Sequence, residues 1–197
     1  MNQAGSIELN DLLTSVRDCR LCESSLPLGP RPVVQLDANA RILIAGQAPG
    51  RRVHETGIAF DDPSGDRLRE WMGIASSVFY DAAKIAILPM GFCYPGSGKS
   101  GDLPPRPECA TAWRRQLLNA IPDIRLTLVI GQYAQRWHLP STERNLTETV
   151  RARRSYDKSL FPLPHPSPRN NIWMKKNPWF LESVVPELHE AVSRALR

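Results

Sequence analysis

The feature that most constrains the fold is a series of short apolar segments that each end in a glycine or proline turn. The segments are "RILIAG" (41–46), "KIAILPM" (84–90), "RLTLVIG" (125–131) and "KSLFPLP" (158–164). Before and between them lie stretches with the amphipathic pattern of helices, such as residues 6–20, 63–74 and 108–121. Strands that are apolar on both faces and alternate with helices indicate a parallel sheet covered on both sides. We therefore expect one α/β domain over residues 1–197, a three-layer α/β/α sandwich with a central, mostly parallel four-stranded sheet.

Parallel sheets of this kind bind ligands at the carboxyl ends of their strands. Three loops are expected to meet there: the turn after residue 46, the loop after residue 90, and "HPSPRN" at residues 165–170. The second loop contains "GSGKS", which is similar to the end of a phosphate-binding loop. The full pattern requires glycine where Cys93 stands, and no helical pattern follows, so a nucleoside triphosphate site is disfavoured.

The chain carries a formal net charge of +5, and its basic residues occur in clusters. These clusters are Arg51–Arg52, Arg114–Arg115, residues 151–154 ("RARR") and Lys175–Lys176. They fit either a solvated basic surface or contacts to the phosphates of a nucleic acid. No apolar run reaches the ~18 residues of a membrane span, and no secretory signal pattern opens the chain. We expect a cytoplasmic protein without a membrane partner.

Four cysteines form two spaced pairs, Cys19 with Cys22 and Cys93 with Cys109. Disulfides are rare in a reducing cytosol, so these thiols point to a metal or to redox chemistry. A thioredoxin-like pair would follow a strand, whereas "CRLC" follows a helical pattern and leads into a proline-rich loop. Thiolates hold either zinc or a [4Fe–4S] cluster, and the spacing alone does not choose between them. Four buried free thiols are the remaining alternative.

Five motifs, taken in order, resemble the uracil-DNA glycosylase superfamily and particularly its iron–sulfur, family 4-like branch. They are "CRLC", "LIAGQAPG", "CYPGSGKSGDLPPRPEC", "LTLVIGQYA" and "HPSPRN", and the resemblance spans roughly residues 17–169. The resemblance implies a monofunctional DNA glycosylase, a hydrolase that cleaves the N-glycosidic bond of uracil or another deaminated base in DNA and leaves an abasic site. It also implies that the four cysteines hold a structural [4Fe–4S] cluster. We expect a monomer.

The resemblance also suggests catalytic residues. His165 would donate a hydrogen bond to uracil O2, although a lone histidine is often structural. "GIAFDDPSGDRL" is similar to a segment of another branch of the superfamily, which places Asp62 at a catalytic aspartate that activates water or stabilises a cation. The alternative is that Asp61 and Asp62 merely cap the following helix. Gln47 stands where the iron–sulfur branch has glutamate, so it can position water but cannot be an anion.

The remaining expected contacts concern the base and the DNA. Phe60 matches the aromatic residue that stacks on the flipped base, with a core phenylalanine as the alternative. Pro89 stands where the family has a base-reading asparagine, so recognition is expected from Gln47 and from main-chain groups of the two loops, at Gly46, Ala48, Met90, Gly91 and Phe92. The expected DNA contacts are Arg51, Arg52, Ser167, Arg169 and Asn170.

Other functions remain open. The missing turn carboxylate and the missing asparagine favour a non-catalytic or abasic-site-capturing DNA-binding member of the same superfamily, for which His54 would be the nucleophile. Hypoxanthine or xanthine could replace uracil as the excised base. An iron–sulfur electron carrier is a third interpretation, and it would leave the "HPSPRN" loop without a role.

Overall fold

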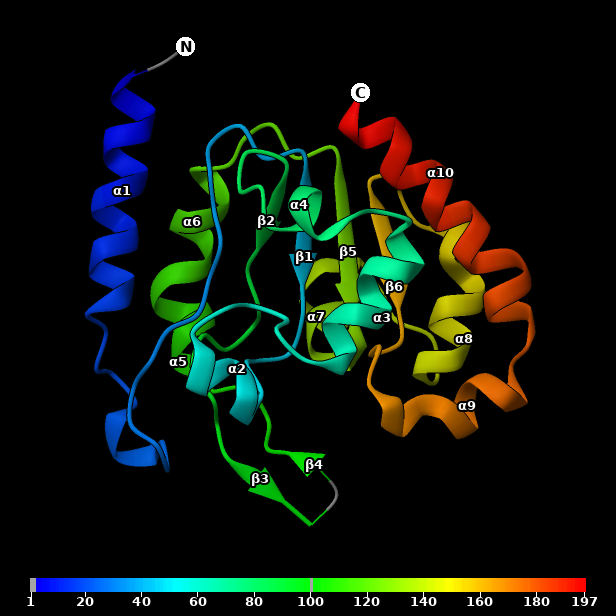
Figure 1. Ribbon diagram of the computed structural model, residues 1–197, viewed down its shortest axis with the longest axis horizontal. Coiled ribbons are helices and arrows are strands. Elements are labelled where there is room, and N and C mark those ends of the chain that lie inside the picture. The colour runs from blue at the N-terminus through cyan, green and yellow to red at the C-terminus, as the bar shows by residue number, and fades with distance from the viewer. Residues whose placement is uncertain (1–2, 100) are drawn as a thin grey trace.

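The computed structural model describes residues 3–99 and 101–197, with side chains from residue 8 onward. Its centre is a four-stranded sheet in the order β2-β1-β5-β6, in which every pair of neighbours is parallel (Figure 1). The strands are β1 (Ile42–Ala45), β2 (Ile85–Ile87), β5 (Leu126–Ile130) and β6 (Leu160–Leu163). The sequence-based prediction of a parallel four-stranded sheet is therefore confirmed.

The sheet follows directly from the apolar character of its strands. In β1, β2 and β5 every residue is buried, as expected for strands covered on both faces. β6 contains Pro162, which has no N–H to give to a neighbouring strand. β6 is an edge strand that pairs only with β5, so its outer side needs no hydrogen bonds to a further strand, and a proline is tolerated there.

Helices cover both faces of the sheet, so the expected three layers are present (Figure 1). Ile42 and Ile44 of β1 face a core shared with α3 and α10, whereas Leu43 faces a core shared with α1 and α6. The helices are α1 (Gln3–Arg17), α2 (Arg51–Thr56), α3 (Pro63–Met72), α4 (Ser76–Phe79), α5 (Pro107–Cys109), α6 (Arg115–Asn119), α7 (Gly131–His138), α8 (Leu146–Arg151), α9 (Asn171–Lys176) and α10 (Val185–Leu196). Two π-helical segments, Ala110–Arg114 and Phe180–Val184, precede α6 and α10.

The carboxyl ends of the four strands lie at the lower edge of the molecule in Figure 1. The same edge carries α2, α9 and a small hairpin of β3 (Ser97–Gly98) and β4 (Gly101–Asp102). The loops that leave β1, β2 and β6 therefore converge, as the sequence predicted. Within residues 3–99 and 101–197, no helix combines the length and the apolar character that crossing a membrane requires.

Candidate active site

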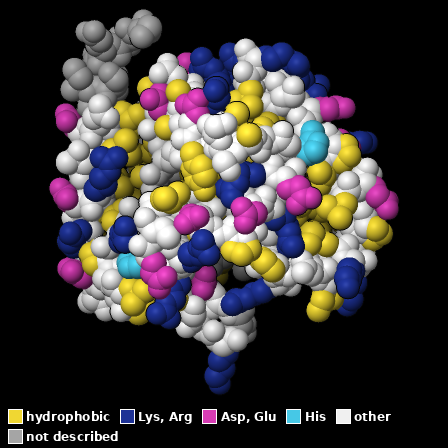
Figure 2. Space-filling model, viewed as in Figure 1, with side chains coloured by type: hydrophobic (Ala, Val, Ile, Leu, Met, Phe, Trp, Pro, Cys, Tyr) yellow, Lys and Arg dark blue, Asp and Glu magenta, His cyan; other side chains and the backbone are white. Residues whose placement is uncertain are grey.

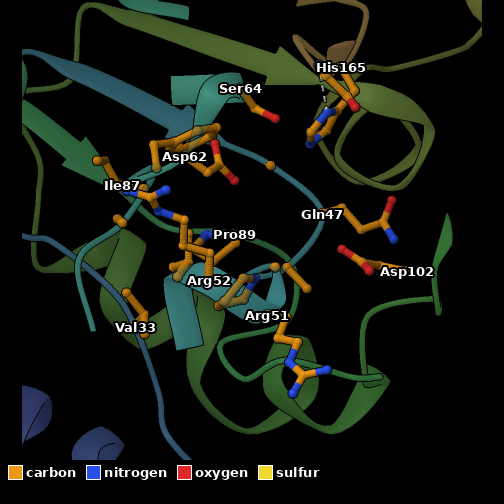
Figure 3. Close-up of a pocket in the computed structure, with 18 of the residues that line it drawn as sticks. Val33, Gln47, Arg51, Arg52, Asp62, Ser64, Ile87, Pro89, Asp102 and His165 are labelled. Atoms are coloured by element: carbon orange, nitrogen blue, oxygen red, sulfur yellow. Dashed lines mark hydrogen bonds between the residues drawn. The ribbon is translucent and has the colours of Figure 1, made fainter. Parts of the chain in front are cut away.

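A cavity of about 260 Å³ opens where these loops meet (Figure 3). Its walls come from the turn after β1, the start of α3, the end of β2, the hairpin, and the loop after β6. Most of the residues singled out from the sequence line it: Gly46, Gln47, Ala48, Arg51, Arg52, Phe60, Asp62, His165, Ser167 and Arg169. Residues from these five segments of the chain are thus brought into one site.

His165 follows β6 in a loop held by prolines on both sides. The backbone N–H of Ser167 donates to its Nδ1 at 3.2 Å, and the Asn170 amide donates to its carbonyl at 2.7 Å. Burial lowers the pKa of His165 below its usual value, although Asp62 and Asp102 act in the opposite direction. The imidazole is therefore neutral at neutral pH, and because Nδ1 accepts, the proton resides on Nε2. This leaves His165 with one donor that faces the cavity (Figure 3).

The loop that carries His165 is fixed from α3. The guanidinium of Arg67 donates to the carbonyls of Pro166 at 3.3 Å and Ser167 at 3.0 Å. Hydrogen bonds from a charged donor are among the stronger ones in proteins. Arg67 therefore ties the helix that begins beside Asp62 to the loop that presents the imidazole.

Asp62 both caps a helix and faces the cavity. It is the N-cap of α3, where its Oδ1 accepts from the Gly65 N–H at 2.9 Å. Its Oδ2 lies 3.9 Å from the point that a Cβ on Gly50 would occupy, beside the turn that follows β1. Helix capping therefore involves one carboxylate oxygen, and the other has no hydrogen-bond partner among the described residues.

Phe60 lies on the cavity wall in an unusual backbone conformation. Its φ of 55° is in the left-handed region, which is uncommon for a bulky residue. Its carbonyl oxygen sits so close to α3 that a Cβ on Gly65 would lie 1.8 Å from it. The ring packs edge-on against Phe79, with 6.0 Å between centroids, and its tip is near Gly46. The ring is thus held between the core and the cavity.

The main-chain groups of Met90, Gly91 and Phe92 do not take the place expected from the sequence. The N–H of Met90 donates to the carbonyl of Gly46 at 2.8 Å, and that of Gly91 to the carbonyl of Gln47 at 2.9 Å. The N–H of Phe92 donates to Cys109 Sγ at 3.5 Å. None of the three residues lines the cavity. The donors assigned to base recognition are therefore already engaged within the protein, and this part of the expectation is corrected.

A buried arginine supports the end of β2 instead. Arg114, with 0% exposure, donates to the carbonyls of Leu88 at 3.0 Å and Pro89 at 2.8 Å. Its second Nη atom lies 2.6 Å from His138 Nε2. Burial, with the Arg114 charge adding to it, lowers the pKa of His138 to about 3, so His138 is a neutral acceptor. Arg114 thereby holds the Pro89 wall of the cavity in place.

Two other expected residues lie outside the cavity. Asn170 lines a neighbouring groove. His54 is 8% exposed on α2, its ring is 6.2 Å from that of Tyr94, and burial lowers its pKa. His54 does not line the cavity, so it has no access there to a sugar.

Ser64 and Asp102 line the cavity but were not identified from the sequence. Ser64 lies in the first turn of α3, two residues after Asp62. Asp102 belongs to the hairpin between Cys93 and Cys109. The only sequence signal for Asp102 is that it is a carboxylate in one of the three loops expected to meet at this edge.

The four cysteines are free thiols, three of them buried. Burial raises the pKa of Cys93 to about 12 and that of Cys109 to about 11, and the neighbouring cysteines add to both effects. Trp113 Nε1 donates to Cys19 Sγ at 3.3 Å. Across the described part of the chain, no group of three or more His, Cys, Asp or Glu side chains is arranged to hold a metal ion.

Comparison with protein families identifies this arrangement. The family model described as "Uracil DNA glycosylase superfamily" matches residues 33–189. The match includes the whole parallel sheet, the three converging loops and the cavity, and it begins after Cys19 and Cys22. This chain belongs to the uracil DNA glycosylase superfamily.

Proposed function

We propose that the protein is a monofunctional DNA glycosylase that hydrolyses the N-glycosidic bond of uracil, or of another deaminated base, and leaves an abasic site. Membership of the superfamily supports glycosylase chemistry on DNA. The observation that carries the proposal is that the free Oδ2 of Asp62, the Nε2 donor of His165 and the ring of Phe60 share one cavity. A cavity of about 260 Å³ suits a single flipped base better than a larger ligand.

The chemistry requires opposite charges at the two ends of the breaking bond. As the bond lengthens, its electron pair leaves with the base, and positive charge develops on the sugar. His165 donates to the base oxygen that becomes negative. A preorganised donor of this kind lowers the activation free energy by about 2.7–4 kcal/mol. Water attacks the sugar C1′ and gives its proton to Asp62. Phe60 stacks on the base and keeps it in the cavity.

Few polar groups are available to recognise the base, because Pro89 in the cavity wall has no side-chain amide. Ser64 and Gln47 line the same cavity as His165, and the Ser64 hydroxyl and Gln47 Oε1 have no hydrogen-bond partner among the described residues. The Gln47 Nε2 is already engaged by the carbonyl of Leu103 at 2.9 Å. Uracil, hypoxanthine and xanthine each offer a carbonyl to the His165 donor, so all three belong in the substrate test.

The surface around the cavity is suited to the DNA backbone. Arg51 and Arg52 of α2 and Arg169 of the loop after β6 line its mouth. Lys175 and Lys176 follow on α9. Figure 2 shows Lys and Arg side chains around this lower edge of the molecule. Flipping a base costs a few kcal/mol, which contacts to the flanking phosphates offset, and binding should weaken as salt increases.

We further propose that the four cysteines hold a structural [4Fe–4S] cluster. Two observations fit: the cysteines influence one another's pKa, and N–H groups of Trp113 and Phe92 point to Cys19 and Cys109 sulfur, as is common around such clusters. Each iron of such a cluster would take one thiolate, so the four cysteines would supply its four protein ligands. Iron and sulfide analysis tests this: Cys93→Ser should lose the iron that the wild-type protein retains.

The alternative is a non-catalytic or abasic-site-capturing member of the superfamily. The observation in its favour is that the turn after β1 carries neutral Gln47 rather than a carboxylate. Capture of an abasic site by His54 is disfavoured, because its ring is buried beside Tyr94, outside the cavity.

Asp62→Asn tests the catalytic proposal cleanly, because asparagine also caps helices and should preserve α3. Excision should fall about 100-fold or more, while Asp61→Asn, which alters a neighbouring carboxylate outside the cavity, should retain the wild-type rate. The substrates are oligonucleotides that contain uracil, hypoxanthine or xanthine. An Asp62→Asn variant that excises as fast as the wild-type protein would remove Asp62 from the mechanism.

A further inference from the structure

A second carboxylate, that of Asp102, enters the cavity from the hairpin. Its Oδ1 accepts a hydrogen bond from Ser97 Oγ at 2.9 Å, and Ser97 Oγ is itself 2.7 Å from the Tyr94 hydroxyl. These contacts fix one carboxylate oxygen, and Oδ2 has no hydrogen-bond partner among the residues that the structure describes. Figure 3 shows Asp62, Asp102 and His165 around the same open space.

The free oxygens of Asp62 and Asp102 converge on one point. A Cβ on Gly50 would lie 3.6 Å from Asp102 Oδ2 and 3.9 Å from Asp62 Oδ2. Each carboxylate is held through its Oδ1, Asp62 by the N-terminus of α3 and Asp102 by Ser97. Gly50 has no side chain to separate the two anions. The site therefore presents two oriented carboxylate oxygens beside the turn after β1.

The hairpin that carries Asp102 is anchored on both sides of the cavity. The Gln47 amide donates to the carbonyl of Leu103, the residue after Asp102, at 2.9 Å. From the other side, the Arg169 guanidinium packs on Gly101, where a Cβ would lie 2.6 Å from its Nη1. The neutral side chain of Gln47 thus holds in place the hairpin backbone that carries the Asp102 carboxylate.

We propose that Asp102 is a second catalytic carboxylate, which supplies from the hairpin the negative charge that the turn at Gln47 lacks. The inference rests on the proposed glycosylase function. Asp62 takes the proton of the attacking water, whereas the Asp102 carboxylate stabilises the positive charge on the sugar. No further reactant is needed: water adds at C1′, and the electron pair of the broken bond leaves with the base.

The first test is the single-turnover rate of Asp102→Asn. We expect a loss of about 100-fold, with DNA affinity unchanged within about threefold. Asp11→Asn, which changes an exposed carboxylate on α1, should keep the wild-type rate. A wild-type rate in Asp102→Asn would overturn the assignment.

A binding assay keeps the test independent of turnover. Two oligonucleotides are compared, one with a protonated pyrrolidine in place of the sugar and one with a neutral tetrahydrofuran. The wild-type protein should bind the cationic analogue about tenfold more tightly, and Asp102→Asn should lose that preference. If the wild-type protein excises no base, the proposed function fails, and this preference still decides the role of Asp102. Equal binding of both analogues by the wild-type protein would overturn the inference.

Discussion

Replacing His165 by alanine should remove the donor that stabilises the departing base. Only Nε2 is available for this role, because Nδ1 accepts from the Ser167 N–H at 3.2 Å. One donor of this kind contributes about 2.7–4 kcal/mol, which corresponds to a rate loss of about 10²–10³-fold. The Asn170 side chain donates to the main-chain carbonyl of residue 165, so this contact, which orients the loop, can still form in His165→Ala.

The assay is single-turnover excision with enzyme in excess over a labelled oligonucleotide. His189→Ala, which removes a histidine of α10 outside the cavity, is the matched control and should retain the wild-type rate. Since burial lowers the pKa of His165, the wild-type rate should show no inflection near pH 6.5, where an exposed imidazole titrates. A His165→Ala rate within about threefold of the wild-type value would refute the donor role.

Three further predictions concern the framework of the site. Gly65→Ala should destabilise the fold by about 3 kcal/mol, because its Cβ would meet the Phe60 carbonyl oxygen at 1.8 Å; an unchanged urea midpoint would contradict this. Arg67→Met should slow excision about tenfold through a loosened His165 loop, with DNA affinity preserved, and an unchanged rate would contradict the positioning role. The pKa of His138 is about 3 when folded and near 6.5 when unfolded, so the unfolded chain binds a proton first as pH falls. Stability should therefore decrease below pH 6.5, by about 2 kcal/mol at pH 5, and His138→Gln should remove that part of the pH dependence in urea titrations; an equal loss in both proteins would contradict it.

The sheet and most of the cavity could be predicted from the sequence because their signals are local. The buried strand β1 and the turn after it are contiguous, and parallel pairing alone brings that turn beside the loop of His165. Asp62 was identified because the contiguous segment "GIAFDDPSGDRL" is similar to a segment of another branch of the superfamily. Such local patterns can be read from the sequence without knowledge of long-range contacts.

The parts that sequence reasoning missed depend on contacts between distant segments. Asp102 faces the cavity because Gln47 and Arg169 anchor its hairpin from opposite sides, and no local pattern encodes these contacts. The main-chain groups of Met90 and Gly91 were expected to be free, yet the turn after β1 supplies carbonyls that engage both of their N–H groups. Whether a backbone donor is available depends on its tertiary partner.

The measurement that tests glycosylase function most directly is the identity of the product. Wild-type protein is incubated with oligonucleotides that carry uracil, hypoxanthine or xanthine, single-stranded and opposite each normal base. A monofunctional glycosylase should release the free base and leave an aldehydic abasic site that alkali cleaves, with no protein–DNA adduct. Retained DNA binding without release of any base, or a covalent adduct in place of free abasic product, would contradict the proposed function.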